Sequence, residues 1–132
     1  MQDDPRYDDV VSDVKAFLEE RLAFAVAEGV LEEHVWLDPG IGFGKAADHN
    51  LELLSRLDEL VAIGRPLVVG TSRKSLLGTL TLKGVDRRLP GTIATNVLAL
   101  ARGAQIFRVH DVAEVVDALT VARAVLLGRQ PA

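Results

Sequence analysis

The chain has 132 residues, enough for one domain with a sizeable core and too few for two. A net charge of −4 gives no general attraction to nucleic acid or anionic lipid, and the absence of cysteine excludes disulfides and thiolate chemistry. An acidic, polar start and the lack of an apolar run of about 20 residues exclude a secretory signal and a membrane span, so we expect a soluble, cytoplasmic protein without nucleic-acid or membrane partners.

The first half of the chain predicts a helix, a strand and a second helix. Apolar residues at intervals of three and four predict an amphipathic helix from about 8 to 28. Residues 34–40 (HVWLDPG) are a short apolar run closed by Pro39 and Gly40, which is typical of a buried strand that ends in a turn. The next helix is expected to be capped by Asp48 and to stop at Gly64.

The second half repeats the alternation twice. Strands are expected over 66–72 (PLVVGTS) and 105–111 (QIFRVHD). Between them lie a helical turn at 73–80, a polar connection at 83–91 and a helix at 92–103. Asp111 and Glu114 have the spacing of a capping box at the start of a last helix over 112–128. The residues expected to point inward from that helix are Val115, Leu119, Ala122 and Leu126.

The order is therefore one leading helix followed by three strand–helix units. The strand ends at 38, 69 and 108 are 31 and 39 residues apart, which suits right-handed βαβ crossovers of about 30 residues or more. The strands are apolar on both faces, as in a parallel sheet covered by helices. Three strands are too few for a complete eight-stranded barrel of about 250 residues. We expect residues 1–132 to be part of a single larger α/β domain.

The unusual polar residues follow the three strands. Asp38 follows the first strand, residues 71–75 (TSRKS) follow the second, and residues 108–111 (RVHD) close the third. Because the carboxyl ends of parallel strands meet at one edge, these groups are expected to share a site.

The first cluster, residues 37–45 (LDPGIGFGK), supports two interpretations. Asp38, held by Pro39, is a rigid carboxylate suited to a planar pair of N–H donors, with Phe43 as an apolar wall. Alternatively, the segment is only a glycine-rich turn. It is not a nucleotide-binding P-loop, because three residues rather than four separate Gly40 from Gly44 and Ala46 stands where that loop needs Ser or Thr.

The second cluster combines hydroxyl groups and cations at the expected start of a helix. Backbone N–H groups and the helix dipole favour an anion there, carboxylate or phosphate. The alternative is ordinary capping by Ser72, with Arg73 and Lys74 in solvent.

The third cluster places Arg108 and His110 two residues apart, hence on one face of a strand, where they could hold a phosphate group. The alternative is a buried Arg108 that pairs with Asp111. His34 and His49 are assigned no role.

Together these motifs resemble a known family. Residues 37–45, GTSRKS at 70–75, Gly91-Thr92 and RVHDV at 108–112 strongly resemble the last three strand motifs of dihydropteroate synthases, in order and in spacing. The similarity extends into the leading helix, including Pro5, Tyr7, Asp9 and Val10. It implies an α/β fold that is the C-terminal portion of a (β/α)8 TIM barrel, incomplete in this chain. It also implies a transferase of folate biosynthesis, which condenses 7,8-dihydropterin-methyl pyrophosphate with p-aminobenzoate and releases pyrophosphate.

The resemblance also implies roles for individual residues. The pterin would be bound by Asp38, Phe43, Gly70, Lys74 and Arg108, of which Lys74 and Arg108 would also be catalytic. The pyrophosphate would be held by Arg108 and His110. The p-aminobenzoate would contact Phe43, Ser72 and Ser75.

Three further expectations follow from the resemblance. The Mg²⁺ cofactor of the family would be bound by residues in the missing N-terminal half, with no metal ligand in this chain. The chain would form a homodimer or associate with an N-terminal half, and would be inactive alone. The acidic tract at 3–9 and the pair Arg87-Arg88 would be surface variation.

Two rival functions remain open. One is the pterin-binding domain of a corrinoid-dependent methyltransferase, which shares the fold and a pterin-binding Asp but has no pyrophosphate or p-aminobenzoate to hold. The other is a non-catalytic barrel fragment that associates with a partner through open sheet edges and exposed apolar surface.

Overall fold

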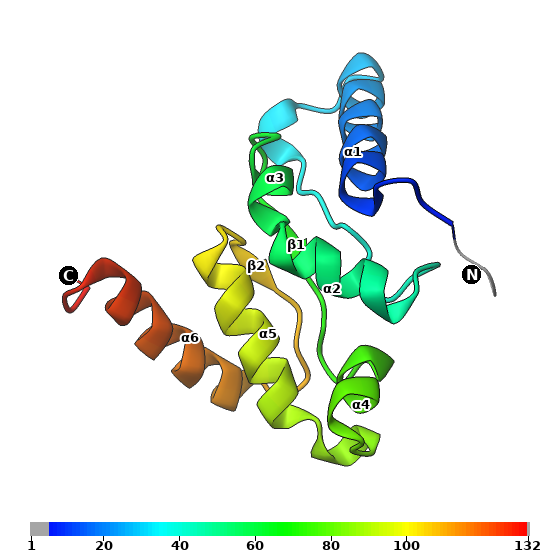
Figure 1. The fold of residues 1–132 in the computed structure, drawn as a ribbon. Helices are drawn as coiled ribbons and strands as arrows, with labels where there is room; N and C mark the ends of the chain where they lie inside the picture. The colour runs from blue at the N-terminus through cyan, green and yellow to red at the C-terminus, as the bar shows by residue number, and fades with distance from the viewer. Residues whose placement is uncertain (1–5, 132) are drawn as a thin grey trace.

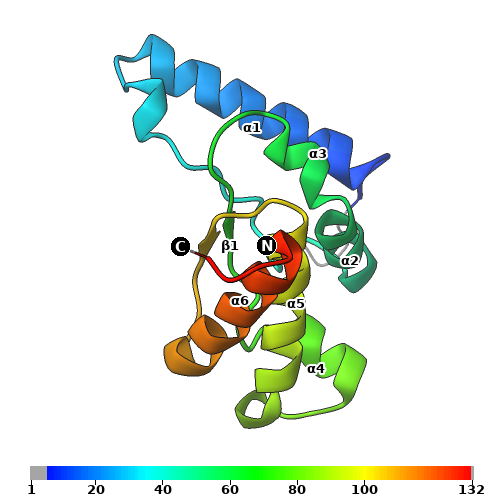
Figure 2. The same cartoon turned by 90° about the vertical axis from the view of Figure 1, so that its left-hand side faces the viewer.

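In a computed structural model that describes residues 6–131, helices surround a very small parallel sheet (Figures 1 and 2). Pro5 lies outside the described residues. The helices are α1 (Val10–Ala27), α2 (Ala47–Ser55), α3 (Leu57–Val61), α4 (Ser75–Thr81), α5 (Leu89–Ala101) and α6 (Val112–Leu127), with 3-10 helices η1 (Glu32–His34) and η2 (Val85–Arg87). The strands are β1 (Val68–Val69) and β2 (Ile106–Phe107). In both views α1 and α4 lie at opposite ends of the molecule, with the sheet between them.

The sheet is shorter than the sequence predicts. β1 and β2 pair in parallel, Val68 with Ile106 and Val69 with Phe107. The strand expected at 34–40 is reduced to a single parallel bridge between Leu37 and Leu67. It ends there because Asp38 Oδ1 accepts the N–H of Gly40 at 2.8 Å, which turns the chain around Pro39. The mixed helix and sheet content agrees with the predicted α/β class, but these residues alone do not form three full strands.

Two helices differ from the predicted boundaries. The helix expected from 48 to 64 is divided at Arg56, whose backbone (φ −119°, ψ 28°) belongs to neither α2 nor α3. The helix expected at 92 begins at Leu89, because Pro90 occupies its first turn, where a fixed φ and a missing N–H are tolerated.

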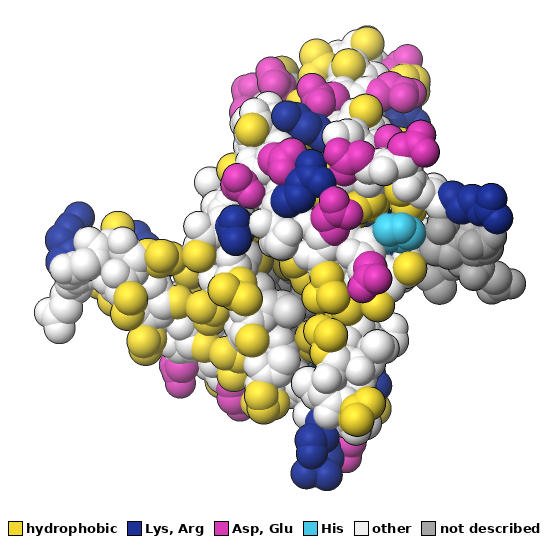
Figure 3. Space-filling view, in the orientation of Figure 1, with side chains coloured by type: hydrophobic (Ala, Val, Ile, Leu, Met, Phe, Trp, Pro, Cys, Tyr) yellow, Lys and Arg dark blue, Asp and Glu magenta, His cyan; other side chains and the backbone are white. Residues whose placement is uncertain are grey.

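The core lies where α1, α2 and α3 meet the sheet. Leu53, Leu57 and Leu60 are fully buried beside Leu67 and Val69. By contrast, α6 packs against α5 and buries only Val115 of its own residues, so the prediction that Leu126 points inward is wrong: Leu126 is 56% exposed. The side chains on the outer side of α5 and α6 form an apolar surface over the lower left of Figure 3. The most exposed large apolar residues of these two helices are Leu98, Val112, Val116, Val121, Val125 and Leu126.

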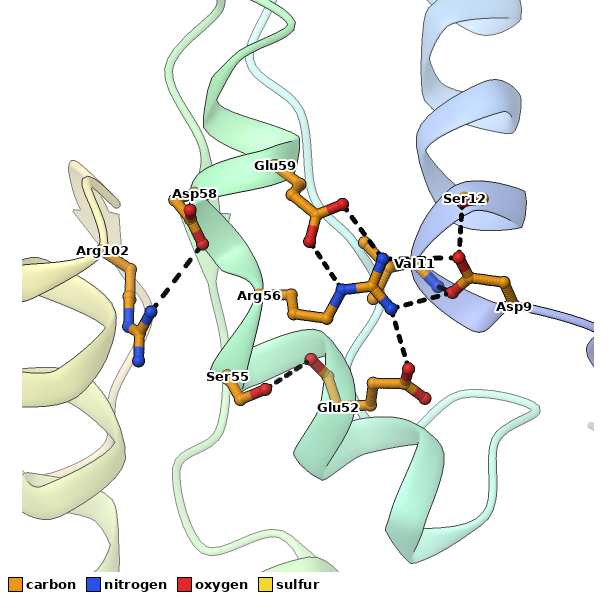
Figure 4. A network of polar contacts seen from close by, with 9 residues as sticks. All are labelled: Asp9, Val11, Ser12, Glu52, Ser55, Arg56, Asp58, Glu59 and Arg102. Carbon is orange, nitrogen blue, oxygen red and sulfur yellow. Dashed lines mark hydrogen bonds and ion pairs between the residues drawn. The ribbon is translucent and has the colours of Figure 1, made fainter.

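A polar network joins α1 to the break between α2 and α3 (Figure 4). Arg56 donates to Asp9 Oδ1 at 3.0 Å, to Glu52 at 2.8 Å and to Glu59 at 2.6 Å. Asp9 also caps α1 by accepting the N–H of Val11 at 3.2 Å. Asp9 therefore has a structural role, which corrects its assignment to surface variation.

This network predicts a stability change in acid. The Ser12 hydroxyl, and next the Arg56 guanidinium, hydrogen-bond the Asp9 carboxylate and lower its pKa from the ordinary 3.8 to about 2. A depressed carboxyl pKa stabilises the fold above the unfolded-state pKa, and this contribution is lost as pH falls through the folded-state value. The free energy of unfolding should therefore decrease between about pH 4 and pH 2. Urea titrations at several pH values in this range measure how strongly the free energy of unfolding depends on pH. Asp9→Asn should weaken this dependence, whereas the control Asp117→Asn should leave it as in the parent chain. The same pH dependence in all three proteins would contradict the prediction.

Arg88 corrects a second assignment to surface variation. Its guanidinium donates to the carbonyls of Arg73 at 2.9 Å and Lys83 at 3.1 Å, and lies across Gly78. A Cβ at Gly78 would sit 2.7 Å from the guanidinium carbon, closer than packed atoms approach. Arg88 therefore ties the polar connection to the loop that follows β1. No helix within residues 6–131 combines the length and apolar character needed to cross a bilayer.

Candidate active site

The three polar clusters meet at the carboxyl edge of the sheet. Asp38 directly follows the bridge at Leu37, residues 70–75 follow β1, and residues 108–111 follow β2. A small cavity of about 280 Å³ opens there, lined by Gly70, Ser72, Lys74, Arg108, Val109 and His110. A Cβ at Gly70 would lie 3.9 Å from both Lys74 Nζ and Arg108 Nε, so this glycine lies next to both cations.

Lys74 lies at the centre of the arrangement. Its ammonium donates to the carbonyl of Ile41 and lies 4.7 Å from the centroid of the Phe43 ring, a cation–π contact. Gly42 permits this approach: its φ is +90°, and a Cβ there would be 3.3 Å from Lys74 Cδ. Burial lowers the pKa of Lys74; the charge of Asp38 opposes this shift, and the weaker repulsion of Arg108 adds to it.

The loop at 38–45 is shaped by residues to which sequence analysis gave no role. Lys45 Nζ donates to the carbonyls of Gly40 at 2.8 Å and Phe43 at 2.9 Å, and the buried Asn50 accepts the N–H of Gly42 at 2.9 Å. The sequence feature that could have pointed to Lys45 is its position at the end of the glycine-rich motif. Burial, followed by the nearby charge of Lys74, lowers the pKa of Lys45 as well.

Asp38 and Phe43 lie beside the small cavity rather than in its lining. Asp38 is exposed and lines a second cavity of about 390 Å³, together with Tyr7, Phe17 and Lys45. Its charge nevertheless acts on both Lys74 and Lys45, which places a carboxylate next to the cationic site. Phe43 is 56% exposed and reaches the site through its contact with Lys74.

The loops after β1 and β2 are joined by hydrogen bonds. Ser72 is buried; its Oγ lies 2.7 Å from Nδ1 of His110 and accepts the backbone N–H of that residue at 3.1 Å. Next to this pair, Arg73 donates to both carboxylate oxygens of Asp111, at 3.3 and 2.9 Å. Ser75 is exposed at the start of α4.

The Arg73–Asp111 ion pair overturns two expectations. The capping box of Asp111 and Glu114 is absent, since Asp111 makes no side-chain bond to the start of α6 and is turned toward Arg73 instead. The ion pair considered for Arg108 is likewise taken by Arg73, so Arg108 is left exposed at the rim of the small cavity.

Metal ligands are not gathered at this edge. Among residues 6–131 there is no group of three or more His, Asp or Glu side chains that could hold an ion. The described residues therefore do not fit a Mg²⁺ site of their own. What the site offers is a half-buried lysine, an exposed arginine and histidine, and a nearby carboxylate, a set suited to an anionic ligand with a polar ring.

Comparison with known sequences gives a consistent result. The family model of pterin-binding enzymes matches residues 1–110. The dihydropteroate synthase of Escherichia coli K12 is 45% identical over 130 residues, which cover 98% of this chain and 46% of that enzyme. The dihydropteroate synthase of Haemophilus influenzae is 45% identical over 121 residues, 92% of this chain and 44% of the enzyme. The chain thus spans about half the length of the curated relatives it matches.

Solved structures agree with the sequence comparison. A Yersinia pestis dihydropteroate synthase with a sulfonamide drug superposes with a TM-score of 0.94 at 41% identity, covering 97% of this chain and 47% of that one. The Xanthomonas albilineans enzyme in complex with 7,8-dihydropteroate gives a TM-score of 0.90 at 46% identity, with 92% and 48% covered. The described fold is therefore found within chains about twice as long.

Proposed function

Because the chain belongs to the family of pterin-binding enzymes, we propose that it is the C-terminal part of a dihydropteroate synthase barrel. The reaction joins 7,8-dihydropterin-methyl pyrophosphate to p-aminobenzoate. The observation that carries the proposal is the small cavity in which Lys74, Arg108 and His110 converge, with Asp38 beside it. A relative in complex with 7,8-dihydropteroate, 46% identical over this region, supports the choice of substrate.

The chemistry requires charge stabilisation and positioning. The bond between the pterin methylene carbon and the pyrophosphate oxygen breaks, and pyrophosphate leaves with the electron pair. The arylamine nitrogen then bonds to the methylene carbon and loses a proton. Arg108 and His110 would hold the leaving pyrophosphate, and Asp38 would accept pterin N–H groups. Lys74 would donate to pterin acceptors and counter the charge that develops as the bond breaks.

The remaining substrate and the metal are also proposals. Phe43, Ser72 and Ser75 would lie along p-aminobenzoate, and Gly70 would let the pterin approach the backbone. Since Ser72 already bonds His110, its hydroxyl would act mainly through that histidine. Any Mg²⁺ would be bound by residues outside this chain. A partner chain or segment would complete the barrel.

A chimeric enzyme tests the function. This chain replaces the matching 130-residue segment of the Escherichia coli synthase, and dihydropteroate formation is measured. The same graft made from the Yersinia pestis enzyme controls for the junctions. We expect the chimera to turn over. A folded, inactive chimera beside an active control graft would reject the proposed function.

In that chimera, Arg108→Ala and His110→Ala should each weaken binding of the pyrophosphate-bearing substrate. Each removes a charge-assisted contact worth about 1.5–3 kcal/mol, or roughly ten- to a hundredfold in affinity. Calorimetric titration with pyrophosphate measures the effect directly. Arg129→Ala, on an exposed arginine far along the sequence from the site, serves as the control. Unchanged pyrophosphate affinity in both variants would show that these side chains do not bind the anion.

A further inference from the structure

Arg73 occupies an unusual position in the loop after β1. Its φ is +58°, a left-handed conformation that is uncommon for a residue with a side chain. Two backbone contacts hold it there: its N–H donates to Thr92 Oγ1 at 3.2 Å, and its carbonyl accepts from Arg88 Nη1 at 2.9 Å. Backbone strain of this kind persists only where the surroundings enforce it.

The Arg73 side chain supplies a third anchor on a different element. Its guanidinium donates through Nε and Nη2 to both oxygens of Asp111, the residue directly before α6. A two-point contact between planar groups fixes orientation as well as distance. The Asp111 side chain is 24% exposed and that of Arg73 is 40% exposed, so the pair is partly shielded from solvent.

The residue that follows this anchored position is Lys74. A change in the backbone at Arg73 would swing the Lys74 side chain away from Ile41 and Phe43. We propose that Arg73 and Asp111 are positioning residues, which join the loops after β1 and β2 and thereby hold Lys74 at the sheet edge. The inference rests on the proposed function for its catalytic consequence, and on contacts in this chain for its structural part.

A different role for Arg73 would be direct contact with a substrate anion. The geometry argues against it, because the donors of its fork are directed to Asp111 while Arg108 is the exposed arginine of the cavity. The two roles differ in one respect. A positioning pair tolerates exchange of its charges, whereas an anion-binding arginine does not.

The first test uses the chain itself and needs no activity. The sequence has lysine only at 15, 45, 74 and 83, so the amines of isotope-labelled lysine can be titrated individually by NMR, with Lys74→Arg to assign its signal. In Asp111→Ala the Lys74 ammonium should become more exposed, and its pKa, which burial lowers in the parent chain, should rise toward the ordinary lysine value. Asp117→Ala, which removes an exposed carboxylate within α6, should leave the Lys74 titration unchanged. Asp111→Asn keeps the side-chain shape and provides the same test if the alanine variant does not fold. An unchanged Lys74 titration, or loss of cooperative folding in both variants, would overturn the proposal.

The second test measures rates in the active chimera. Arg73→Asp and Asp111→Arg should each lower kcat about tenfold or more, since small misplacements of a catalytic group cost about that much. The double variant should recover most of the loss, because Asp is tolerated at a positive φ and the ion pair is restored with reversed polarity. Failure of the double variant to recover, with a raised KM for the pyrophosphate substrate, would assign Arg73 to anion binding instead. A folded but inactive parent chimera beside an active control graft would reject the proposed function, while the NMR result would still decide the positioning role.

Discussion

Lys74→Ala is expected to lower kcat of the chimeric enzyme by about a hundredfold or more, the usual effect of removing one preorganised group that stabilises developing charge. Lys74 has a lowered pKa from burial, and its ammonium lies against Ile41 and Phe43, so it is already oriented before substrate arrives. A preorganised charge in a site with little water stabilises a transition state more strongly than a charge that is surrounded by solvent. Lys83→Ala removes an exposed lysine from the adjacent connection and is the matched control.

Asp38→Asn should act on pterin binding more than on the rate of bond breaking. Asp38 Oδ1 accepts the N–H of Gly40, and the other oxygen is the one we expect to accept from the pterin ring. In Asp38→Asn, the side-chain N–H of the amide would face the N–H of the pterin ring, so two hydrogen-bond donors would meet. A polar group left unpaired in the pocket costs about 1–3 kcal/mol, or roughly ten- to a hundredfold in affinity.

Thermal melts separate function from folding for both variants. Neither side chain is part of the buried core, so both should melt close to the parent chimera. If both variants melt normally and also turn over at the parental rate, the site assignment is wrong. If both unfold, Lys74 and Asp38 are structural residues.

The 132-residue chain by itself is expected to show no synthase activity and to associate. It spans about half of the Escherichia coli and Yersinia pestis enzymes, so we expect the residues that complete the site, and the metal ligands, to come from elsewhere. Large apolar side chains are exposed on both α1 and α6. The exposed fraction is 56–74% for Phe17 and Phe24 on α1 and for Val121 and Val125 on α6. A contiguous apolar groove of about 450 Å³ also runs between α5 and α6. Exposed apolar surface of this kind favours self-association or binding to a complementary chain.

Mixing experiments test this expectation. The purified chain is assayed alone and with a separately expressed amino-terminal half of the Escherichia coli synthase. We expect turnover only in the mixture, and concentration-dependent sedimentation of the chain alone. Turnover by the chain alone, or a single monomeric species in the ultracentrifuge at high micromolar concentration, would contradict it. Sedimentation of Val125→Glu under the same conditions shows whether the groove between α5 and α6 contributes.

The order of elements could be predicted from sequence because each carries a local signal. Periodic apolar residues mark α1, and Pro39, Gly64 and Gly103 end their segments through backbone geometry that few other residues allow. Strand lengths could not be predicted in the same way. A strand continues only while a neighbouring strand pairs with it. Leu37 donates to the carbonyl of Pro66 and accepts from the N–H of Val68, which makes the single bridge opposite Leu67.

The site could be predicted only to the level of which segments meet. Parallel strands bring their carboxyl ends together, and this placed Lys74, Arg108 and His110 correctly at one edge. Which arginine pairs with Asp111 could not be predicted from the sequence. Arg73 and Arg108 are both candidates, and Arg108 is much closer to Asp111 along the chain. The left-handed turn at Arg73 brings the more distant arginine to the carboxylate. Such a choice depends on backbone conformation, for which an arginine residue gives no signal.

The contact of Arg88 with Gly78 has a consequence for how this chain can diverge. The two positions share one volume: a Cβ at position 78 would displace the Arg88 guanidinium from its bonds to the carbonyls of Arg73 and Lys83. A shorter residue at 88 leaves the same space free. Mutational order therefore matters. Gly78→Ala should be deleterious in the present background and become acceptable after Arg88→Ser, so one change is permissive for the other. Sequences descended from this one are expected to show positions 78 and 88 changing together, a constraint that arises from packing ten residues away in the chain.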